Sequence, residues 1–173
     1  MSTAQLRACI LLALTALLSS VTAADVVTDW NQKANASILE AKIYPYAGTR
    51  VLAIMHVAMF DAINSIEGRY MPYKFKVPAP AGSTPEAAGV AAAHAALVKL
   101  FPEQKADLDA AYAASLAQIP DSAGKTAGII VGEEVAGKVL AWRASDGQVT
   151  GSCRCSVRRR GRTGRPLASE SCS

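Results

Sequence analysis

The chain has 173 residues, of which 51% are hydrophobic and 18% are charged, and its formal net charge is +4. That charge is unevenly placed, because residues 24–150 carry 11 basic and 13 acidic residues, whereas residues 151–173 carry six arginines and one glutamate. The main part of the chain is slightly acidic, so nucleic-acid binding would have to rest on the C-terminal residues alone. We expect no nucleic-acid partner.

Residues 1–23 have the three parts of a secretory signal peptide. Arg7 lies in a short N-terminal region, residues 8–18 (ACILLALTALL) are apolar, and residues 19–23 end in the small-residue pattern V-x-A. The alternative is an uncleaved membrane anchor, for which the apolar run is short. We expect cleavage after Ala23, a secreted or periplasmic protein, and no membrane partner after the signal has been removed.

The remaining 150 residues suit one domain, residues 24–150, and a different C-terminal segment. Apart from Cys9 in the signal peptide, the cysteines lie at positions 153, 155 and 172, so no disulfide is expected within the domain. Residues 151–173 are rich in arginine, serine and cysteine and carry few apolar side chains, which predicts a disordered tail.

The first helix is expected over residues 25–42, with Trp30, Ala34, Ile38 and Ala41 recurring at helical spacing and Asp25 and Asp29 in its first turns. The sequence Asn35-Ala36-Ser37 in this helix matches a glycosylation sequon, which we interpret as incidental. Residues 44–48 are expected to break the helix and turn the chain.

Residues 49–66 (TRVLAIMHVAMFDAINSI) are apolar nearly all round, which predicts the central core helix, ending before Gly68. Arg50, Asp61 and Asn64 form a thin polar stripe, and a polar group on a buried helix needs a partner. A proline-containing loop, residues 68–84, follows. Four of its residues are expected to pack it onto the helices: Tyr70, Met71, Tyr73 and Phe75.

Three further helices are expected over residues 87–101, 103–119 and 122–143, and no stretch alternates with the period of a strand. A hydroxyl at Ser83 or Thr84 is expected to cap the first of them and Asp121 the last. In the last helix Gly124, Gly128, Gly132 and Ala136 recur every fourth residue, which indicates the close approach of another helix. The sequence predicts an all-α bundle of about five helices.

No catalytic, cofactor-binding or metal-binding residue can be assigned from motifs, since the sequence lacks G-x-S-x-G, H-E-x-x-H and a Walker loop. His56, His94 and Asp61 could form a metal site if the fold brought them together. The alternative is two structural histidines and a buried aspartate bonded to backbone or to a tyrosine. Asp109 is expected on an exposed helix turn.

Several pieces of the chain occur in the order found in a known family. They are Asp29-Trp30-Asn31, residues 50–66, Tyr70-Met71-Pro72-Tyr73, Leu100-Phe101-Pro102, Gly132-Glu133 and residues 143–147. Together, over about residues 25–150, the chain resembles the N-terminal helical part of bacterial vanadium-dependent haloperoxidase-like proteins, in the type 2 phosphatidic acid phosphatase superfamily.

The resemblance implies a secreted all-α protein whose longer relatives hold vanadate or phosphate among lysine, arginine and histidine. Those residues lie in three motifs of a second helical half, Lys-x6-Arg-Pro, Ser-Gly-His and Arg-x5-His-x3-Asp. None occurs here; Arg158 and Arg165-Pro166 reproduce the spacing of the first with arginine for lysine, which we interpret as chance. No catalytic residue is carried over, and no cofactor is expected in this chain.

The abrupt change of composition after residue 150 leads to the hypothesis that a frameshift has replaced the second half. The chain is then the N-terminal fragment of a haloperoxidase- or phosphatase-like protein, inactive alone, with an exposed apolar face that favours self-association. Two other hypotheses remain: a stand-alone exported helical binding or scaffolding module, and a small metal protein using the two histidines and Asp61.

Overall fold

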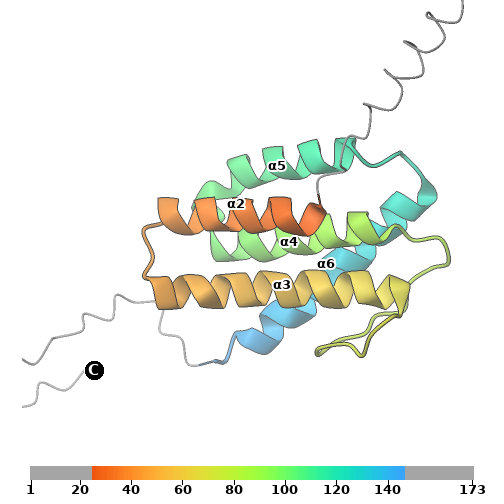
Figure 1. Ribbon diagram of the computed structural model, residues 1–173, viewed down its shortest axis with the longest axis horizontal. Coiled ribbons are helices and arrows are strands. Elements are labelled where there is room, and N and C mark those ends of the chain that lie inside the picture. The colour runs from red at the N-terminus through yellow and green to blue at the C-terminus, as the bar shows by residue number, and fades with distance from the viewer. Residues whose placement is uncertain (1–24, 147–173) are drawn as a thin grey trace, which may run out of the picture.

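The computed structural model describes residues 25–146, which form helices arranged around one hydrophobic core (Figure 1). No strand occurs among these residues, so the predicted all-α class is confirmed. The α-helices are α2 (Val26–Glu40), α3 (Pro45–Glu67), α4 (Pro85–Leu100), α5 (Lys105–Ala117) and α6 (Ala123–Arg143), and a short 3-10 helix, η1 (Pro102–Gln104), precedes α5.

Helix α2 begins where the sequence predicted, but the face that it buries is narrower than the predicted one. The side chain of Asp25 caps the helix by accepting a hydrogen bond from the amide of Val27 at 3.0 Å. Trp30 and Ala34 are buried as expected, but Ala41 is exposed. Ser37 is buried instead, and its carbonyl accepts a hydrogen bond from the side-chain amide of Gln104 at 3.1 Å. This contact ties α2 to η1.

Helix α3 starts earlier than predicted. Residues 45–48 were expected to form a turn, but Pro45 occupies the first helical turn, where its missing amide hydrogen has no helical partner to lose. The predicted end is confirmed, because Gly68 caps the helix in the left-handed conformation with φ of 64°.

The sequence predicted that residues 49–66, which lie in α3, form the central core helix, but the most enclosed helix is α4. Nine of the 16 residues of α4 are buried, and it packs against α2, α3, α5 and α6. Helix α3 keeps one side open, where 40% of Phe60 is exposed. The reason is side-chain size, because a helix made largely of alanine is narrow enough for four neighbours to surround it.

The glycine row of α6 is the surface that lies closest to α4, as the four-residue repeat predicted. A Cβ added at Gly128 would collide with the carbonyl oxygen of Thr84, and one added at Gly132 would collide with that of Ala88. The amide of Thr84 also donates a hydrogen bond to the carbonyl of Gly124 at 3.0 Å. Backbone therefore packs directly against backbone along this contact.

Two helix caps differ from the prediction. Thr84 precedes α4, yet no hydroxyl caps that helix; the Ser83 hydroxyl donates to the carbonyl of Pro80 at 2.7 Å. At the start of α6 the cap is Ser122, whose hydroxyl accepts from the amide of Lys125 at 3.0 Å. Asp121, the predicted cap, forms an ion pair with the side chain of Lys125 at 2.7 Å.

The segment between α3 and α4 is held down by fewer apolar side chains than expected. Val77 is buried and Phe75 is half-buried against Trp142, with ring centroids 6.2 Å apart. Tyr70 and Tyr73 contact Phe60 of α3 and Trp142 of α6 but stay 67% and 65% exposed. Met71 is 86% exposed, so for this residue the prediction of packing onto the helices was wrong.

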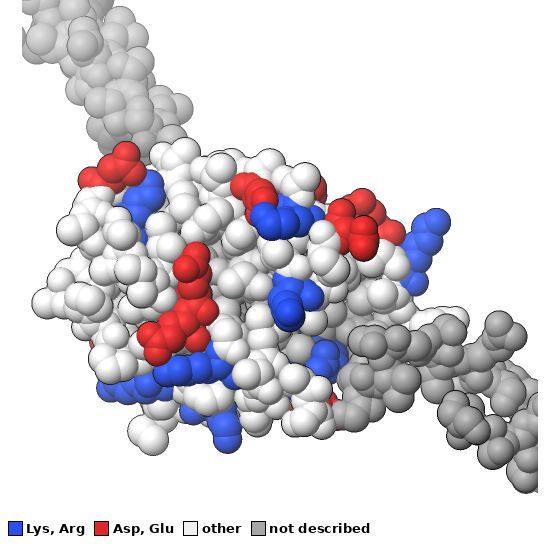
Figure 2. All heavy atoms as spheres, turned by 180° about the vertical axis from the view of Figure 1, so that it is seen from behind, with Lys and Arg blue, Asp and Glu red and all other residues white. Residues whose placement is uncertain are grey.

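Charged side chains are spread over the surface without segregation by sign on the face seen from behind in Figure 2. Among residues 25–146, no helix is long and apolar enough to cross a membrane. The predicted signal peptide, the tail with its cysteines, and the motif-like Arg158 and Arg165 all lie outside the described residues.

Candidate functional site

An apolar groove with a volume of about 340 Å³ lies between α2, α3 and the loop after α3. Met59 lies at its base, where it is almost fully buried, and the exposed rings of Phe60 and Tyr70 stand at its rim with centroids 6.3 Å apart. The lining residues are Val27, His56, Met59, Phe60, Ile63, Asn64, Glu67 and Tyr70. A volume of this size lies within the range of small-ligand sites.

The polar groups of the groove are engaged with the protein itself. His56 Nε2 is 3.1 Å from the side-chain oxygen of Asn31, which joins α3 to α2. Asn64 uses both ends of its amide on Tyr70, donating to the carbonyl at 2.7 Å and accepting from the amide at 2.9 Å. The carboxylate of Glu67 is 3.4 Å from Arg69. These groups shape the groove and leave its walls suited to binding apolar groups.

Asp61, one of the three candidate metal ligands, is fully buried and belongs to a structural anchor. Its carboxylate accepts hydrogen bonds from the backbone amides of Tyr73, Lys74 and Phe75 at 2.6, 2.9 and 2.8 Å. A charged acceptor with three amide donors is well compensated for its burial. This matches the alternative reading of a buried aspartate bonded to backbone.

The Ser65 hydroxyl extends the same anchor one helical turn further. It donates to the carbonyl of Asp61 at 2.7 Å and accepts from the amide of Val77 at 3.1 Å. Together with Asn64 and Asp61, it fixes the backbone of the loop from Tyr70 to Val77. We call these three side chains the loop anchor.

His94 of α4 lies in a separate cluster, in contact with α5. Its ring stacks on Tyr112 of α5 with centroids 4.2 Å apart, and its Nε2 is 2.8 Å from Asp109. The edge of Trp30 faces the same ring at 6.3 Å. The histidine therefore connects α2, α4 and α5.

Two pKa values in the His94 cluster are shifted. Hydrogen bonds from Lys105 and then His94 lower the pKa of Asp109. Burial, followed by the negative charge of Glu133, raises the pKa of the Tyr112 hydroxyl. Asp109 was expected on an exposed helix turn but is half-buried, and its contact with His94 was not visible in the sequence.

The structure does not bring the three candidate metal ligands together. His56 contacts Asn31, His94 contacts Asp109, and Asp61 is saturated by amides. Residues 25–146 contain no group of three or more histidine, cysteine, aspartate or glutamate side chains placed to hold a metal ion.

Vanadate, which the family resemblance implies for longer relatives, does not fit the donors of residues 25–146. The groove carries the carboxylate of Glu67, which repels an oxyanion. Arg50 and Arg143 approach each other at the end of α6, but both are paired with Asp146, at 3.4 and 2.6 Å. No step of an oxyanion reaction can be assigned to these residues.

Comparison of the chain with protein-family models, with curated proteins and with solved structures found no match.

Proposed function

We propose that the helical domain is the N-terminal half of an exported haloperoxidase- or phosphatase-like protein, and that it serves as the scaffold against which a second, catalytic half packs. The observation that carries the proposal is the apolar groove between α2 and α3, with Phe60 and Tyr70 exposed at its rim. Apolar surface of this kind favours contact with another protein surface. The proposal is also supported by the order in which the pieces of sequence that resemble the family occur along the chain.

On this proposal the chain alone is inactive, and the residues that would bind vanadate or phosphate belong to the second half. The deciding experiment is to sequence the gene well beyond codon 150 and translate all three frames. We expect another frame to contain Lys-x6-Arg-Pro, Ser-Gly-His and Arg-x5-His-x3-Asp. If none of the frames contains them, the proposal fails.

The groove can be tested in the protein itself. Phe60→Ser should reduce binding of a hydrophobic dye and any concentration-dependent self-association, because it removes apolar surface from the rim. Leu39→Ser is the matched control, since Leu39 is 76% exposed and does not line the groove. Equal effects of the two substitutions would show that the groove is not a special surface.

A stand-alone binding module is the second candidate, and the size of the groove favours it. A module that binds a small apolar ligand should be monomeric and unfold in one cooperative transition. The scaffold proposal instead expects self-association through the uncovered groove. Sedimentation over a range of concentrations distinguishes the two.

We also propose that the protein is exported and that its signal peptide is cleaved after Ala23. The start of α2 supports this position, because cleavage there leaves the capping residue Asp25 in the mature chain. Mass spectrometry of the protein recovered from the periplasm or the medium tests it. A mature chain that begins after Asp25 would contradict the proposal.

A further inference from the structure

Exposed aromatic and basic side chains of the loop after α3 form a surface together with two half-buried residues at the end of α6. It consists of Tyr70, Met71, Tyr73, Lys74, Lys76, Trp142 and Arg143, and we call it the basic-aromatic face. The side chains of Lys74 and Arg143 both lie against the Trp142 ring, each 5.1 Å from its centroid. The Tyr73 ring is 6.4 Å from the same tryptophan.

This face is exposed and at the same time rigidly held. Met71 is 86% exposed, although leaving a large apolar side chain in water is unfavourable. The loop anchor nevertheless fixes the backbone on both sides of it, through Asn64 at Tyr70 and Asp61 at Tyr73. The buried polar side chains of the loop anchor thus hold the loop in a conformation that leaves Met71 exposed.

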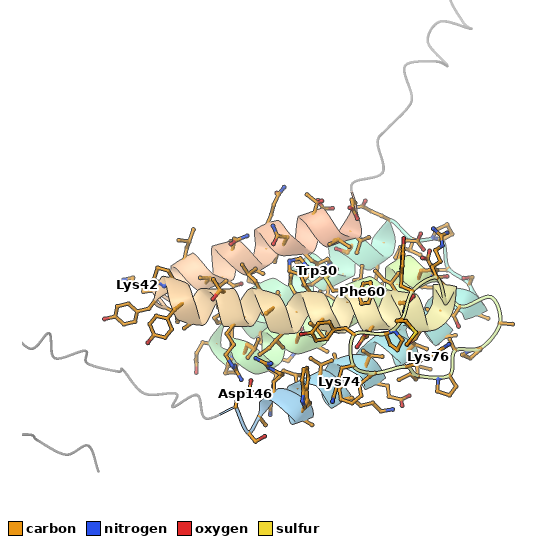
Figure 3. The ribbon with its side chains drawn as sticks, turned by 60° about the horizontal axis from the view of Figure 1, so that its bottom comes forward. Trp30, Lys42, Phe60, Lys74, Lys76 and Asp146 are labelled. Atoms are coloured by element: carbon orange, nitrogen blue, oxygen red, sulfur yellow. The ribbon has the colours of Figure 1, made fainter. Side chains whose placement is uncertain are left out.

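The charge of the face is positive. Neither Lys74 nor Lys76 forms an ion pair with any residue between 25 and 146, whereas Arg143 is paired with Asp146, so the two lysines carry the unpaired positive charge of the face. In Figure 3 Lys74, Lys76 and Asp146 lie along one edge of the molecule. The chain continues from Asp146 into residues 151–173, whose six arginines have the same sign of charge as the face.

We propose that the basic-aromatic face binds the surface of membranes that contain anionic lipids. Lysine and arginine are attracted to anionic headgroups, and tyrosine and tryptophan prefer the interface between headgroups and acyl chains. An exposed methionine beside them gains from entering that interface, whereas it gains little from a nucleic-acid backbone. The proposal differs from the expectation of no membrane partner, and it does not depend on a second protein half.

The test uses the exported chain, with its signal peptide removed and its tail present. Co-sedimentation with vesicles of phosphatidylglycerol mixed with phosphatidylcholine is compared with vesicles of phosphatidylcholine alone. We expect binding only to the anionic vesicles, weakened about tenfold by the double substitution Lys74→Gln, Lys76→Gln. The substitution Met71→Ser should weaken it several-fold without changing the charge.

Matched controls separate this face from general attraction by the tail. Lys42→Gln with Lys99→Gln removes two charges elsewhere, and Figure 3 shows Lys42 at the opposite end of the molecule from Lys76. Leu39→Ser removes an exposed apolar side chain from α2. These variants should bind the anionic vesicles like the unchanged protein. Equal losses in the controls, or no binding to the anionic vesicles, would overturn the proposal.

Two further outcomes would replace the membrane with a different partner. Binding to duplex DNA that is as strong as binding to the vesicles and insensitive to Met71→Ser would assign the face to nucleic acid. Sedimentation of the protein without vesicles, abolished by Met71→Ser, would assign it to a second copy of the chain. Either result would overturn the proposal.

Discussion

The contact between α4 and α6 and the loop anchored on α3 are fixed by opposite means. Between α4 and α6, glycines and alanines remove side chains so that backbone meets backbone. On α3, Asp61, Asn64 and Ser65 supply buried polar atoms that replace the missing backbone partners of the loop. The contact between α4 and α6 depends on the absence of side-chain atoms, so substitutions that add atoms should damage it. The loop anchor depends on a few particular polar atoms, so substitutions that remove atoms should damage it.

The largest effect is expected at the loop anchor. Asp61→Ala leaves the amides of Tyr73, Lys74 and Phe75 without their acceptor, and we expect the free energy of unfolding to fall by about 4 kcal/mol. Urea denaturation followed by circular dichroism measures this. Asp61→Asn keeps the shape of the side chain and one acceptor oxygen. Its free energy of unfolding should therefore lie between that of the unchanged protein and that of Asp61→Ala. A loss below about 1 kcal/mol for Asp61→Ala would mean that water replaces the carboxylate readily.

A smaller loss is expected in the glycine row. Gly132→Ala places a Cβ against the carbonyl of Ala88 and the Cβ of Ala91, and α6 must move to accept it. We expect a net loss of about 2 kcal/mol in the free energy of unfolding, in spite of the better helix propensity of alanine.

The neighbouring glycine outside the contact provides the control for this substitution. An added Cβ at Gly137 meets nothing within 4 Å, so Gly137→Ala should stabilise the protein by about 0.5–1 kcal/mol. Stabilisation by both substitutions would show that α4 and α6 separate easily, and that the comparison between the two regions does not hold.

The start of α6 should respond more weakly. Ser122→Ala removes the hydroxyl that accepts from the amide of Lys125, and we expect a loss of about 1 kcal/mol in thermal or chemical unfolding. Asp121→Ala breaks only an ion pair whose aspartate side chain is 97% exposed, so it should cost less. The reverse order would restore Asp121 as the cap that the sequence predicted.

The smallest effect concerns the polar contacts of Asp109 with Lys105 and His94, which lie outside both regions. The pKa of Asp109 is lowered from its ordinary value of 3.8 by Lys105 and His94, so the stabilisation is present above that value. It is lost as the pH falls through the lower pKa of the folded state. Melting temperatures measured from pH 5 downward should therefore decline slightly less in Asp109→Asn. An unchanged decline would show that the contacts of Asp109 with Lys105 and His94 do not contribute to stability.

The contact between α4 and α6 could be predicted from the sequence, and the partners of the loop anchor could not, for a physical reason. Gly124, Gly128 and Gly132 repeat with the period of one helix face, so a local pattern carries the information about the contact. The partners of Asp61 lie 12 to 14 residues away in a segment without periodicity. A buried aspartate indicates that partners exist, but only the folded backbone shows which amides they are.

The candidate site follows the same division. Helical periodicity predicted which side of α2 is buried at Trp30 and Ala34, and therefore where α2 meets the bundle. The groove depends on Tyr70 returning to Asn64 across the loop, and His94 reaches Asp109 across a helix break. Exposure of Met71 could not be inferred, because hydrophobicity alone predicts burial and the loop anchor overrides it.

The burial of Ser37 has a consequence for producing the protein in eukaryotic cells. The sequon Asn35-Ala36-Ser37 lies within α2, where Ser37 is only 2% exposed and the side chain of Asn35 donates to the carbonyl of Asn31 at 2.8 Å. N-linked sugar is normally added to sequons on accessible surface loops. A glycan found on Asn35 would therefore have been attached before α2 folded, and the glycosylated fraction would report how the speed of folding compares with the speed of the transferase.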